Sequence, residues 1–208
     1  EDRRLGPHRV RLERRLSRVY DARSDQHRSL MALTRALEWA PSDRELQQAI
    51  LRVGLGGERR EDVTAGFERA AERTSHPLLR TFLRMRLGYL YADRPDDAIR
   101  VFQSVLEEDP SHIEARRRLE PLLEARGDRE GLIRLLETAA EQSTTEDLPA
   151  VLARLRALYR QTGRDDRHLE EAARSLGKRP FGVLTRITLP LVKSGLLAGG
   201  ALVFLTAM

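Results

Sequence analysis

The chain of 208 residues contains no cysteine, few aromatic residues and almost no lysine. Without cysteine it has no disulfide framework, no thiol nucleophile and no thiolate metal site. Aromatic residues make up only 5% and charged residues 33%, a balance typical of exposed helices rather than of a compact enzyme core. Its only lysines, Lys178 and Lys193, lie near the carboxyl end, and no acidic residue follows Glu171. The composition therefore changes near residue 170.

The formal net charge of +5 would suit a nucleic-acid-binding protein if the excess were spread over a surface. Five basic residues follow Glu171, which leaves 32 basic against 32 acidic residues in the rest of the chain. We interpret runs such as 116–118 and 59–60 as exposed faces paired with Glu114, Glu120 and Glu61 rather than as nucleic-acid contacts. We expect no nucleic-acid partner.

The amino-terminal residues have no apolar region behind them, which excludes a signal peptide at this position. The chain begins without Met and ends inside an apolar run, so we expect a fragment at both ends.

Apolar residues recur at spacings of three and four from about Val10 to Leu158, and Gly, Pro, Asp or Ser interrupts them at short intervals. No segment alternates as a strand does, so the predicted fold class is all-α. The predicted helices cover about 8–23, 26–40, 43–53, 60–74, 77–92, 95–108, 111–126, 128–142 and 145–161.

Several predicted helix ends have a physical cause. Asp43 and Ser111 are expected N-caps, and Glu114 would complete a capping box with Ser111. Pro77 suits the first turn of a helix. The run 54–57, Gly-Leu-Gly-Gly, has no Lys-Ser/Thr and no strand before it, so we interpret it as a helix terminator rather than a phosphate loop.

Proline and glycine mark the other expected ends. Pro41 and Pro110 each follow a predicted helix and would stop it, because proline has no N–H to donate. Gly127 and Gly163 stand where a left-handed C-terminal cap would cost least.

Tyrosine repeats along this body. Tyr20, Tyr91 and Tyr159 follow one another at 71 and 68 residues, about twice the 34 residues of a tetratricopeptide hairpin. The residues expected to pack the repeats are Leu16, Tyr20, Ala36, Pro41, Leu87, Gly88, Tyr91, Ala98, Phe102, Pro110 and Tyr159. Their order, a small residue on one helix, a large one on the next and a closing proline, resembles the tetratricopeptide (TPR) family. Residues 1–165 are thus predicted to form a TPR-like array of antiparallel helical hairpins, a solenoid.

The resemblance is incomplete. Ser17 stands where glycine is usual, the connection from Tyr91 to Ala98 is two residues short, and the helices predicted over 43–74 and 111–142 match poorly. The predicted array is a degenerate one.

Such an array would leave a concave surface, built from the first helix of each hairpin, on which a partner protein or peptide can lie. The five histidines are scattered, and no nucleophile or acid–base group stands out, so we expect no enzyme, no cofactor and no metal. The aromatic residues are expected to pack in the core or between helices: Trp39, Phe67, Phe82 and Phe102, with the three repeat tyrosines.

A second pattern occupies residues 169–208. Its motif positions are Glu171, Ala172, Ala173, Gly177, Ile187, Leu189 and Pro190. This spacing resembles the EAA loop of bacterial ABC-importer inner-membrane permeases, which docks on the ATP-hydrolysing subunit. The resemblance implies a coupling loop over 169–193 and the start of a transmembrane helix over 194–208. It further implies an ABC ATPase subunit as a partner and attachment to a bacterial inner membrane, with the helical repeats cytoplasmic.

The apolar tail permits other interpretations. Residues 194–208 are 15 uncharged residues, fewer than the roughly 20 that span a bilayer. The tail would then lie in a membrane, begin to span it, or cover the repeats as a buried cap, in which case the chain would be soluble in the cytoplasm. The abrupt change near His168 favours a fusion. Two functions stay open: an interaction scaffold with a membrane-associated tail, and a truncated importer permease.

Overall fold

The computed structural model describes residues 2–55, 59–142 and 148–163, and within these ranges it contains nine α-helices and no strand. The helices are α1 (Asp2–Ala22), α2 (Gln26–Trp39), α3 (Arg44–Leu55), α4 (Arg60–Arg73), α5 (Pro77–Leu90), α6 (Pro95–Glu108), α7 (Ile113–Arg126), α8 (Arg129–Gln142) and α9 (Leu148–Gln161). The all-α prediction is confirmed for these residues. The predicted helix spans also agree with the structure to within a few residues at most ends.

The largest difference in helix bounds is at α1, which begins at Asp2 rather than near residue 8. The helix passes through Gly6 and Pro7, a pair that often interrupts helices. Proline is best tolerated near a helix start because the first N–H groups have no intrahelical partner. Gly6 is buried, and a Cβ on it would stand 3.7 Å from the Trp39 ring, an ordinary contact distance.

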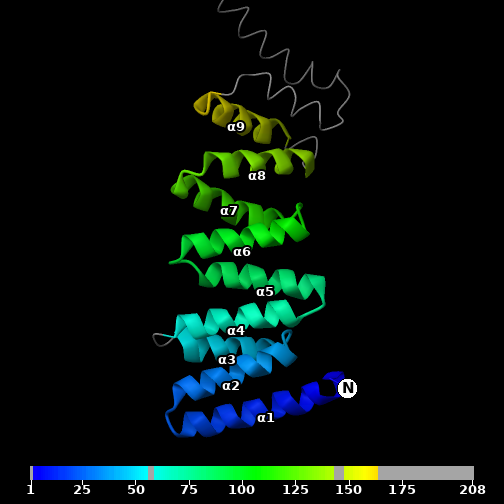
Figure 1. Cartoon of the computed structure of the whole chain (residues 1–208), viewed down its shortest axis with the longest axis vertical. Coiled ribbons are helices and arrows are strands. Elements are labelled where there is room, and N and C mark those ends of the chain that lie inside the picture. The colour runs from blue at the N-terminus through cyan, green and yellow to red at the C-terminus, as the bar shows by residue number, and fades with distance from the viewer. Residues whose placement is uncertain (1, 56–58, 143–147, 164–208) are drawn as a thin grey trace, which may run out of the picture. The chain divides into compact units, whose positions relative to one another are not determined.

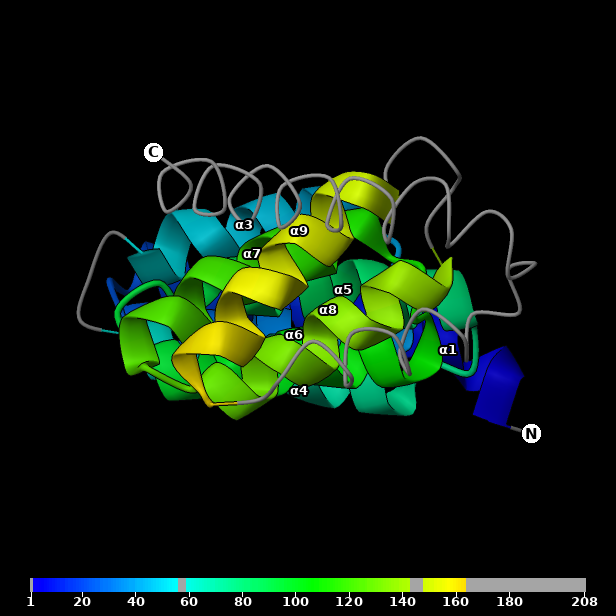
Figure 2. The same ribbon diagram turned by 90° about the horizontal axis from the view of Figure 1, so that it is seen from above.

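The chain divides into two compact units, with the boundary after Leu122 inside α7. In the first unit α1 packs against α2, α2 against α3 and α4, α4 against α5, and α5 against α6. Figure 1 shows these helices in chain order along the unit, each turning back on the one before it. Figure 2, which looks along the helices' stacking direction, shows α3 and α4 on opposite sides.

The core of the first unit lies where the hairpins face one another. Its largest fully buried side chains include Phe67, Leu37 and Ile50. Gly66 on α4 lets that helix approach α2 closely, since a Cβ at residue 66 would lie 2.4 Å from Cγ2 of Thr34. Close approach of this kind explains why α4 packs directly on α2.

Trp39, at the end of α2, joins three helices. The guanidinium carbon of Arg9 on α1 lies 4.4 Å from the indole centroid, and that of Arg73 on α4 lies 3.9 Å from it. Cations over an indole ring are attracted by its negative face. The single tryptophan of the chain therefore holds α1 and α4 to the end of α2.

In the second unit α8 packs against α9 around Leu136 and Leu155. The Tyr159 hydroxyl donates to Glu137 at 2.6 Å. Gly127 and Gly163 have φ of +72° and +73°, so the predicted left-handed caps are confirmed.

The predicted helix starts have mixed outcomes. Asp43 caps α3 by accepting from the Leu46 N–H at 3.1 Å, and Pro77 is in the first turn of α5, both as predicted. The prediction for Ser111 is wrong, because α7 begins two residues later and His112 Nδ1 accepts from the Ala115 N–H at 3.1 Å.

Two other predictions near helix ends, the capping box at Glu114 and the helix terminator at 54–57, also need correction. The Ser111 hydroxyl donates to Asp109 at 2.6 Å, and Glu114 bonds to Arg118 rather than forming a capping box. The run 54–57 does end α3, at Leu55, but Gly54 itself is buried within the last turn of the helix. A Cβ on Gly54 would lie 2.0 Å from Cγ2 of Val63, so this glycine serves the packing of α3 on α4.

None of the described helices combines the length and the apolarity that crossing a membrane requires. The predicted domain boundary at 165–169, the coupling loop and the apolar tail lie outside the described residues.

Candidate functional site

A groove opens in the first unit between α1, the start of α2, and α3. Its volume is about 660 Å³. The residues that line it are Arg14, Ser17, Arg18, Asp21, Gln26, Leu33, Glu45, Leu46, Gln48, Ala49, Arg52 and Val53. The groove exists because α2 packs on α4 while α3, the first helix of its hairpin, is left beside α1 with a gap between them.

The floor of the groove is apolar. Leu33 and Leu46 are buried beneath it, and Ala49 and Val53 are half-buried on the α3 side. The buried Ser17 hydroxyl is satisfied by that of Ser29 at 2.9 Å. A ligand entering the groove would therefore meet aliphatic side chains at its base and would disturb no hydrogen bond of the fold there.

The rim of the groove is charged, and only some of its charged side chains form ion pairs within the protein. Arg14 pairs with Asp43 at 2.5 Å and with Glu45 at 3.3 Å. Arg18 and Arg52 are exposed and form no ion pair with any residue that the structure describes. Two guanidinium groups thus stand at the groove with their hydrogen-bonding capacity directed to solvent, and guanidinium prefers carboxylate partners.

An apolar ridge lies on α5, the first helix of the next hairpin. Leu78, Phe82 and Tyr89 are 77%, 45% and 45% exposed, and spacings of four and seven residues place them on one face of the helix. The expectation that Phe82 packs in the core is wrong. Leu83 and Leu87, on the other face of the same helix, fill the core instead.

Polar contacts orient this face of α5 between the first helices on either side. The Arg86 guanidinium donates from Nη1 to the Gln47 side chain of α3 at 3.0 Å. The Tyr89 hydroxyl donates to Glu114 of α7 at 2.9 Å. Phe82 therefore lies on the side of the unit formed by first helices.

The α7 end of the ridge carries a compact polar cluster. Arg118 pairs with Glu114 at 2.9 Å and lies over the Tyr89 ring at 4.9 Å. Hydrogen bonds from Tyr89 and Arg118 lower the pKa of Glu114. Partial burial raises the pKa of Tyr89, and its bond to Glu114 raises it further. The cluster holds Tyr89 beside Phe102, with the two rings nearly perpendicular at 78° and 6.2 Å between centroids.

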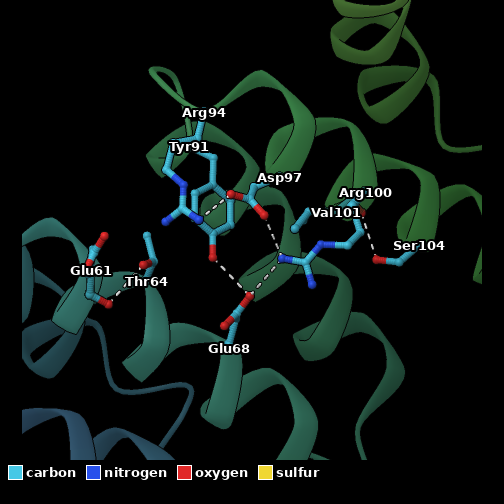
Figure 3. Close-up of polar contacts among 9 residues, drawn as sticks. All are labelled: Glu61, Thr64, Glu68, Tyr91, Arg94, Asp97, Arg100, Val101 and Ser104. Carbon is cyan, nitrogen blue, oxygen red and sulfur yellow. Dashed lines mark hydrogen bonds and ion pairs between the residues drawn. The ribbon is translucent and has the colours of Figure 1, made fainter.

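On the other side of the unit, charged side chains of the second helices α4 and α6 form a paired network (Figure 3). Tyr91 donates to Glu68 of α4 at 3.0 Å, and Arg100 of α6 reaches both Glu68 at 3.6 Å and Asp97 at 2.9 Å. Arg94 pairs with Asp97 at 2.6 Å and lies over the Tyr91 ring. Burial, and then the bond to Glu68, raises the pKa of Tyr91. This network uses its charges to join α4, α5 and α6.

The residues predicted to pack the repeats occupy unequal positions. The buried ones are Ala36, Leu87, Gly88, Tyr91, Ala98, Phe102 and Tyr159. Leu16, Tyr20 and Pro41 are half-buried, and Pro110 is exposed. Gly88 and Phe102 are in direct contact, since a Cβ on Gly88 would lie 2.5 Å from the Phe102 ring. The seven coupling-loop residues from Glu171 to Pro190 lie outside the described part of the chain.

Sequence reasoning found neither the groove nor the ridge. The groove residues are polar and apolar positions on three separate helices, and only the spacing of α1 from α3 brings them together. The exposure of Phe82 could have been predicted, because α5 carries more apolar residues than one face of a helix can bury. The paired arginine runs were found in part: Arg118 does pair with Glu114, but Arg60 pairs with Asp93 rather than Glu61.

Comparison with known proteins gives a fold likeness and one short sequence match. No family model matches the chain. Similar solved structures include the MamA protein, at 12% identity and TM-score 0.40 over 82% of this chain and 91% of that one. Another is YrrB, described as a TPR protein with an unusual peptide-binding site, at 16% identity and TM-score 0.40 over 81% and 87%. A third is MamA from Desulfovibrio magneticus RS-1, at 13% identity and TM-score 0.39 over 82% and 94%.

The sequence match is to a probable molybdenum ABC transporter permease protein of Haloferax volcanii. It is 56% identical over 43 residues, which is 21% of this chain. The chain spans 16% of that permease's length.

Proposed function

We propose that this chain is a non-catalytic scaffold that binds a segment of another protein along the first helices of its hairpins. The observation that carries the proposal is the groove between α1 and α3, which combines a buried aliphatic floor with Arg18 and Arg52 unpaired among the described residues. The exposed Phe82 extends the same side of the unit along α5. A cluster of metal-binding side chains is absent from the described residues.

The chemistry of this surface selects a class of ligand. Aliphatic or aromatic side chains of a peptide would cover the floor and Phe82, because burying apolar surface is favourable by about 25 cal/mol per Å². Carboxylates of the peptide would pair with Arg18 and Arg52, since Arg–carboxylate pairs are bidentate and charge-assisted. The expected ligand is therefore a peptide that combines acidic with apolar residues.

The test is a selection of random short peptides on the intact chain, followed by affinity measurement on the enriched sequences. We expect enrichment of peptides that carry both acidic and large apolar residues. The double variant Arg18→Glu, Arg52→Glu should bind them at least about tenfold more weakly, since tenfold corresponds to about 1.4 kcal/mol. Phe82→Ala should weaken the peptides that carry aromatic residues.

Two matched controls separate the groove from general effects. Arg134→Glu makes the same charge change on an exposed residue of α8, and Leu12→Ala removes an apolar side chain that is 58% exposed on α1. Both should bind the selected peptides as the unaltered chain does. Selected peptides that bind the Arg18/Arg52 variant with unchanged affinity would show that the groove is not the site.

A second function is favoured by the 43-residue match to a permease. We propose that residues 169–193 act as a coupling loop that docks an ABC ATPase subunit, and that residues 194–208 associate with the membrane. The basic residues Arg174, Lys178 and Arg179 would then face the cytoplasm, as the positive-inside tendency requires. The helical repeats would lie on the same side of the membrane.

The coupling proposal is tested by co-purification of the intact chain with an ABC ATPase subunit from the source organism. Gly177→Pro or Glu171→Arg should abolish recruitment of the ATPase, because the first blocks a reversal of the backbone and the second inverts a motif charge. Thr162→Ala, a few residues upstream, is the control and should recruit normally. Recruitment that survives both motif changes would remove the coupling role and leave the scaffold function intact.

A further inference from the structure

The apolar ridge of α5 lies inside the array of helices. Leu78, Phe82 and Tyr89 are 77%, 45% and 45% exposed, and together they extend along about 16 Å of helix. Figure 1 shows α5 within the first unit, between α4 and α6. The Arg86 side chain reaches α3 and the Tyr89 hydroxyl reaches α7, so first helices stand on both sides of the ridge. In a repeat array each hairpin contacts only its neighbours, so a further hairpin at either end would not cover this face.

The polar groups beside the ridge are largely in use, which restricts the backbone that can lie on it. The backbone of α5 is hydrogen-bonded within the helix, from the Arg80 N–H near its start to the Leu87 carbonyl near its end. The Tyr89 hydroxyl donates to Glu114. An extended peptide pressed on the ridge would therefore leave buried backbone groups without partners, each at a cost comparable to a lost hydrogen bond. An α-helix satisfies its own backbone, so a helical segment suits this ridge better.

Arg86 gives the ridge a charge without a counter-ion. It follows Phe82 by four residues, which places it on the same face of α5, and it is half-buried. Its guanidinium donates to the neutral Gln47 side chain at 3.0 Å and forms no ion pair with a carboxylate of the described residues. A partly buried, unpaired charge is costly, and guanidinium prefers a carboxylate partner. A ligand that places a carboxylate beside Arg86 removes that cost.

Two nearer occupants do not combine carboxylates with an apolar row. No acidic residue occurs in α5, so a second copy that packed its own ridge here would bring arginine and no carboxylate from that helix. In the chain's carboxy-terminal segment the acidic residues end at Glu171, before the apolar run begins. Between residues 164 and 171 Leu169 is the only large apolar residue. The occupant that fits the ridge is therefore a helix of another protein.

We infer that the ridge of α5 docks an acidic amphipathic helix of another protein, with large apolar side chains against Leu78, Phe82 and Tyr89 and a carboxylate against Arg86. The inference rests on the proposed scaffold function and deepens it, because it gives the part of the ligand on α5 a conformation and a charge. The groove between α1 and α3 differs from the ridge, since its unpaired arginines offer donors that an extended peptide can use.

The test uses the intact chain and a lactam-stapled helical peptide of about 15 residues, with leucine along one face and glutamate on the flanks of that face. One twin of this glutamate helix carries glutamine in place of each glutamate. A second twin has no staple and carries two central prolines, which break the helix. The unaltered chain should bind the glutamate helix at least about tenfold more tightly than either twin.

Two variants of the ridge separate its apolar and charged parts. Phe82→Ala should weaken binding of the glutamate helix by about tenfold, because the burial of an aromatic side chain is lost. Arg86→Met keeps an unbranched apolar side chain and removes the charge, so it should bind the glutamate helix and the glutamine twin with nearly equal affinity. A purely structural role of Arg86 would lower both affinities and leave their ratio unchanged.

Control variants make the same kinds of change elsewhere. Leu12→Ala truncates an exposed apolar residue of α1, and Arg134→Met removes an exposed charge of α8; both should bind the glutamate helix normally. Circular dichroism of each variant confirms that the helices are intact. The Arg18/Arg52 double variant should also bind the glutamate helix normally, although it loses the peptides selected on the groove. Failure of the groove and failure of the ridge are therefore distinguishable.

Three results would overturn the inference. The first is equal binding of the glutamate helix by Phe82→Ala and Leu12→Ala, or no preference of the unaltered chain for that helix over its glutamine twin. The second is binding of the proline twin as tightly as the stapled helix, which would make an extended segment the occupant. The third is a sedimentation experiment in which the chain dimerises and Phe82→Ala abolishes the dimer, which would make a second copy the occupant.

Discussion

Gly88 of α5 lies directly against the Phe102 ring of α6, so close that a Cβ on residue 88 would come within 2.5 Å of the ring atoms Cε1 and Cζ. Both residues are buried, and Phe102 is 3% exposed. The absence of a side chain at residue 88 therefore sets how closely the two helices of this hairpin approach. It also fixes the ring with which Tyr89 makes a T-shaped contact.

Replacing Gly88 with Ala is expected to destabilise the fold by about 1–3 kcal/mol, because the added methyl group overpacks the hairpin. The measurement is chemical unfolding followed by helical circular dichroism. Gly6→Ala is the control, since a Cβ there meets Trp39 at an ordinary 3.7 Å and helix propensity favours alanine by roughly 1 kcal/mol. In a Phe102→Leu background the cost of Gly88→Ala should fall. An equal cost in both backgrounds would assign the effect to something other than the ring.

The contact between Gly88 and Phe102 could be predicted from the sequence because it is local: the two residues are on neighbouring helices of one hairpin and stand at the spacing that such hairpins repeat. Most helix bounds were predictable for a related reason, since proline, glycine and capping side chains act on their own few residues. Ser111 failed because an N-cap depends on where the helix starts, and His112 competes for the same place one residue later.

The parts that failed depend on distant residues. Gly54 stands in a glycine-rich run that ordinarily ends helices, and only the position of Val63 on α4 shows that it is a packing site. Phe82 belongs to a helix with two apolar faces, and the sequence does not say which one the neighbours cover. The groove depends on the gap between α1 and α3, which lie in different hairpins.

Gly54→Ala tests the corrected role of this glycine. A Cβ at residue 54 would lie 2.0 Å from Cγ2 of Val63, so we expect destabilisation by about 1–3 kcal/mol and relief of part of it by Val63→Ala. Gly127→Ala serves as a comparison, because it should destabilise the fold without overpacking. At this residue φ is +72°, and nothing lies within 4 Å of the added Cβ. Its cost of about 1–2 kcal/mol is backbone strain. Urea unfolding in which Val63→Ala rescued neither variant would contradict the packing role of Gly54.

Tyr91 gives a pH dependence in the alkaline range. Burial and the bond to Glu68 raise its pKa, so the folded state holds the proton more tightly than the unfolded state does. The contribution to stability is complete below the unfolded pKa of about 10 and is lost as the pH rises through the higher folded value. No lysine titrates in the described residues, because Lys178 and Lys193 both lie outside them.

The free energy of unfolding should therefore fall more steeply above about pH 10 in the unaltered chain than in Tyr91→Phe. The tyrosinate absorbance reports the titration itself, and Tyr20→Phe, at a half-buried tyrosine, is the control. Tyr89, whose pKa is also raised, will leave a residual slope in Tyr91→Phe. Identical slopes in Tyr91→Phe and the unaltered chain would show that the bond to Glu68 does not hold the proton.

Gln47 links α3, which lines the groove, to α5, which carries the apolar ridge. Its side chain is 1% exposed, donates from Nε2 to the Pro41 carbonyl at 2.7 Å and accepts from Arg86 at 3.0 Å. Gln47→Leu keeps the volume but leaves a carbonyl and a guanidinium N–H without these bonds, so we expect a loss of about 1–3 kcal/mol in unfolding free energy. In Arg86→Met the same change should cost less, since one orphaned group is gone, and the double-mutant cycle measures the coupling between α3 and α5.

The bond between Gln47 and Arg86 can also be tested through peptide binding. If Gln47→Leu weakens peptides that span the groove and Phe82, while peptides confined to the groove bind normally, then the bond to Arg86 sets the spacing between the two parts of the site. A double-mutant cycle with no coupling energy would show that the Gln47–Arg86 bond does not link α3 to α5. Core packing alone would then align the groove with the apolar ridge of α5.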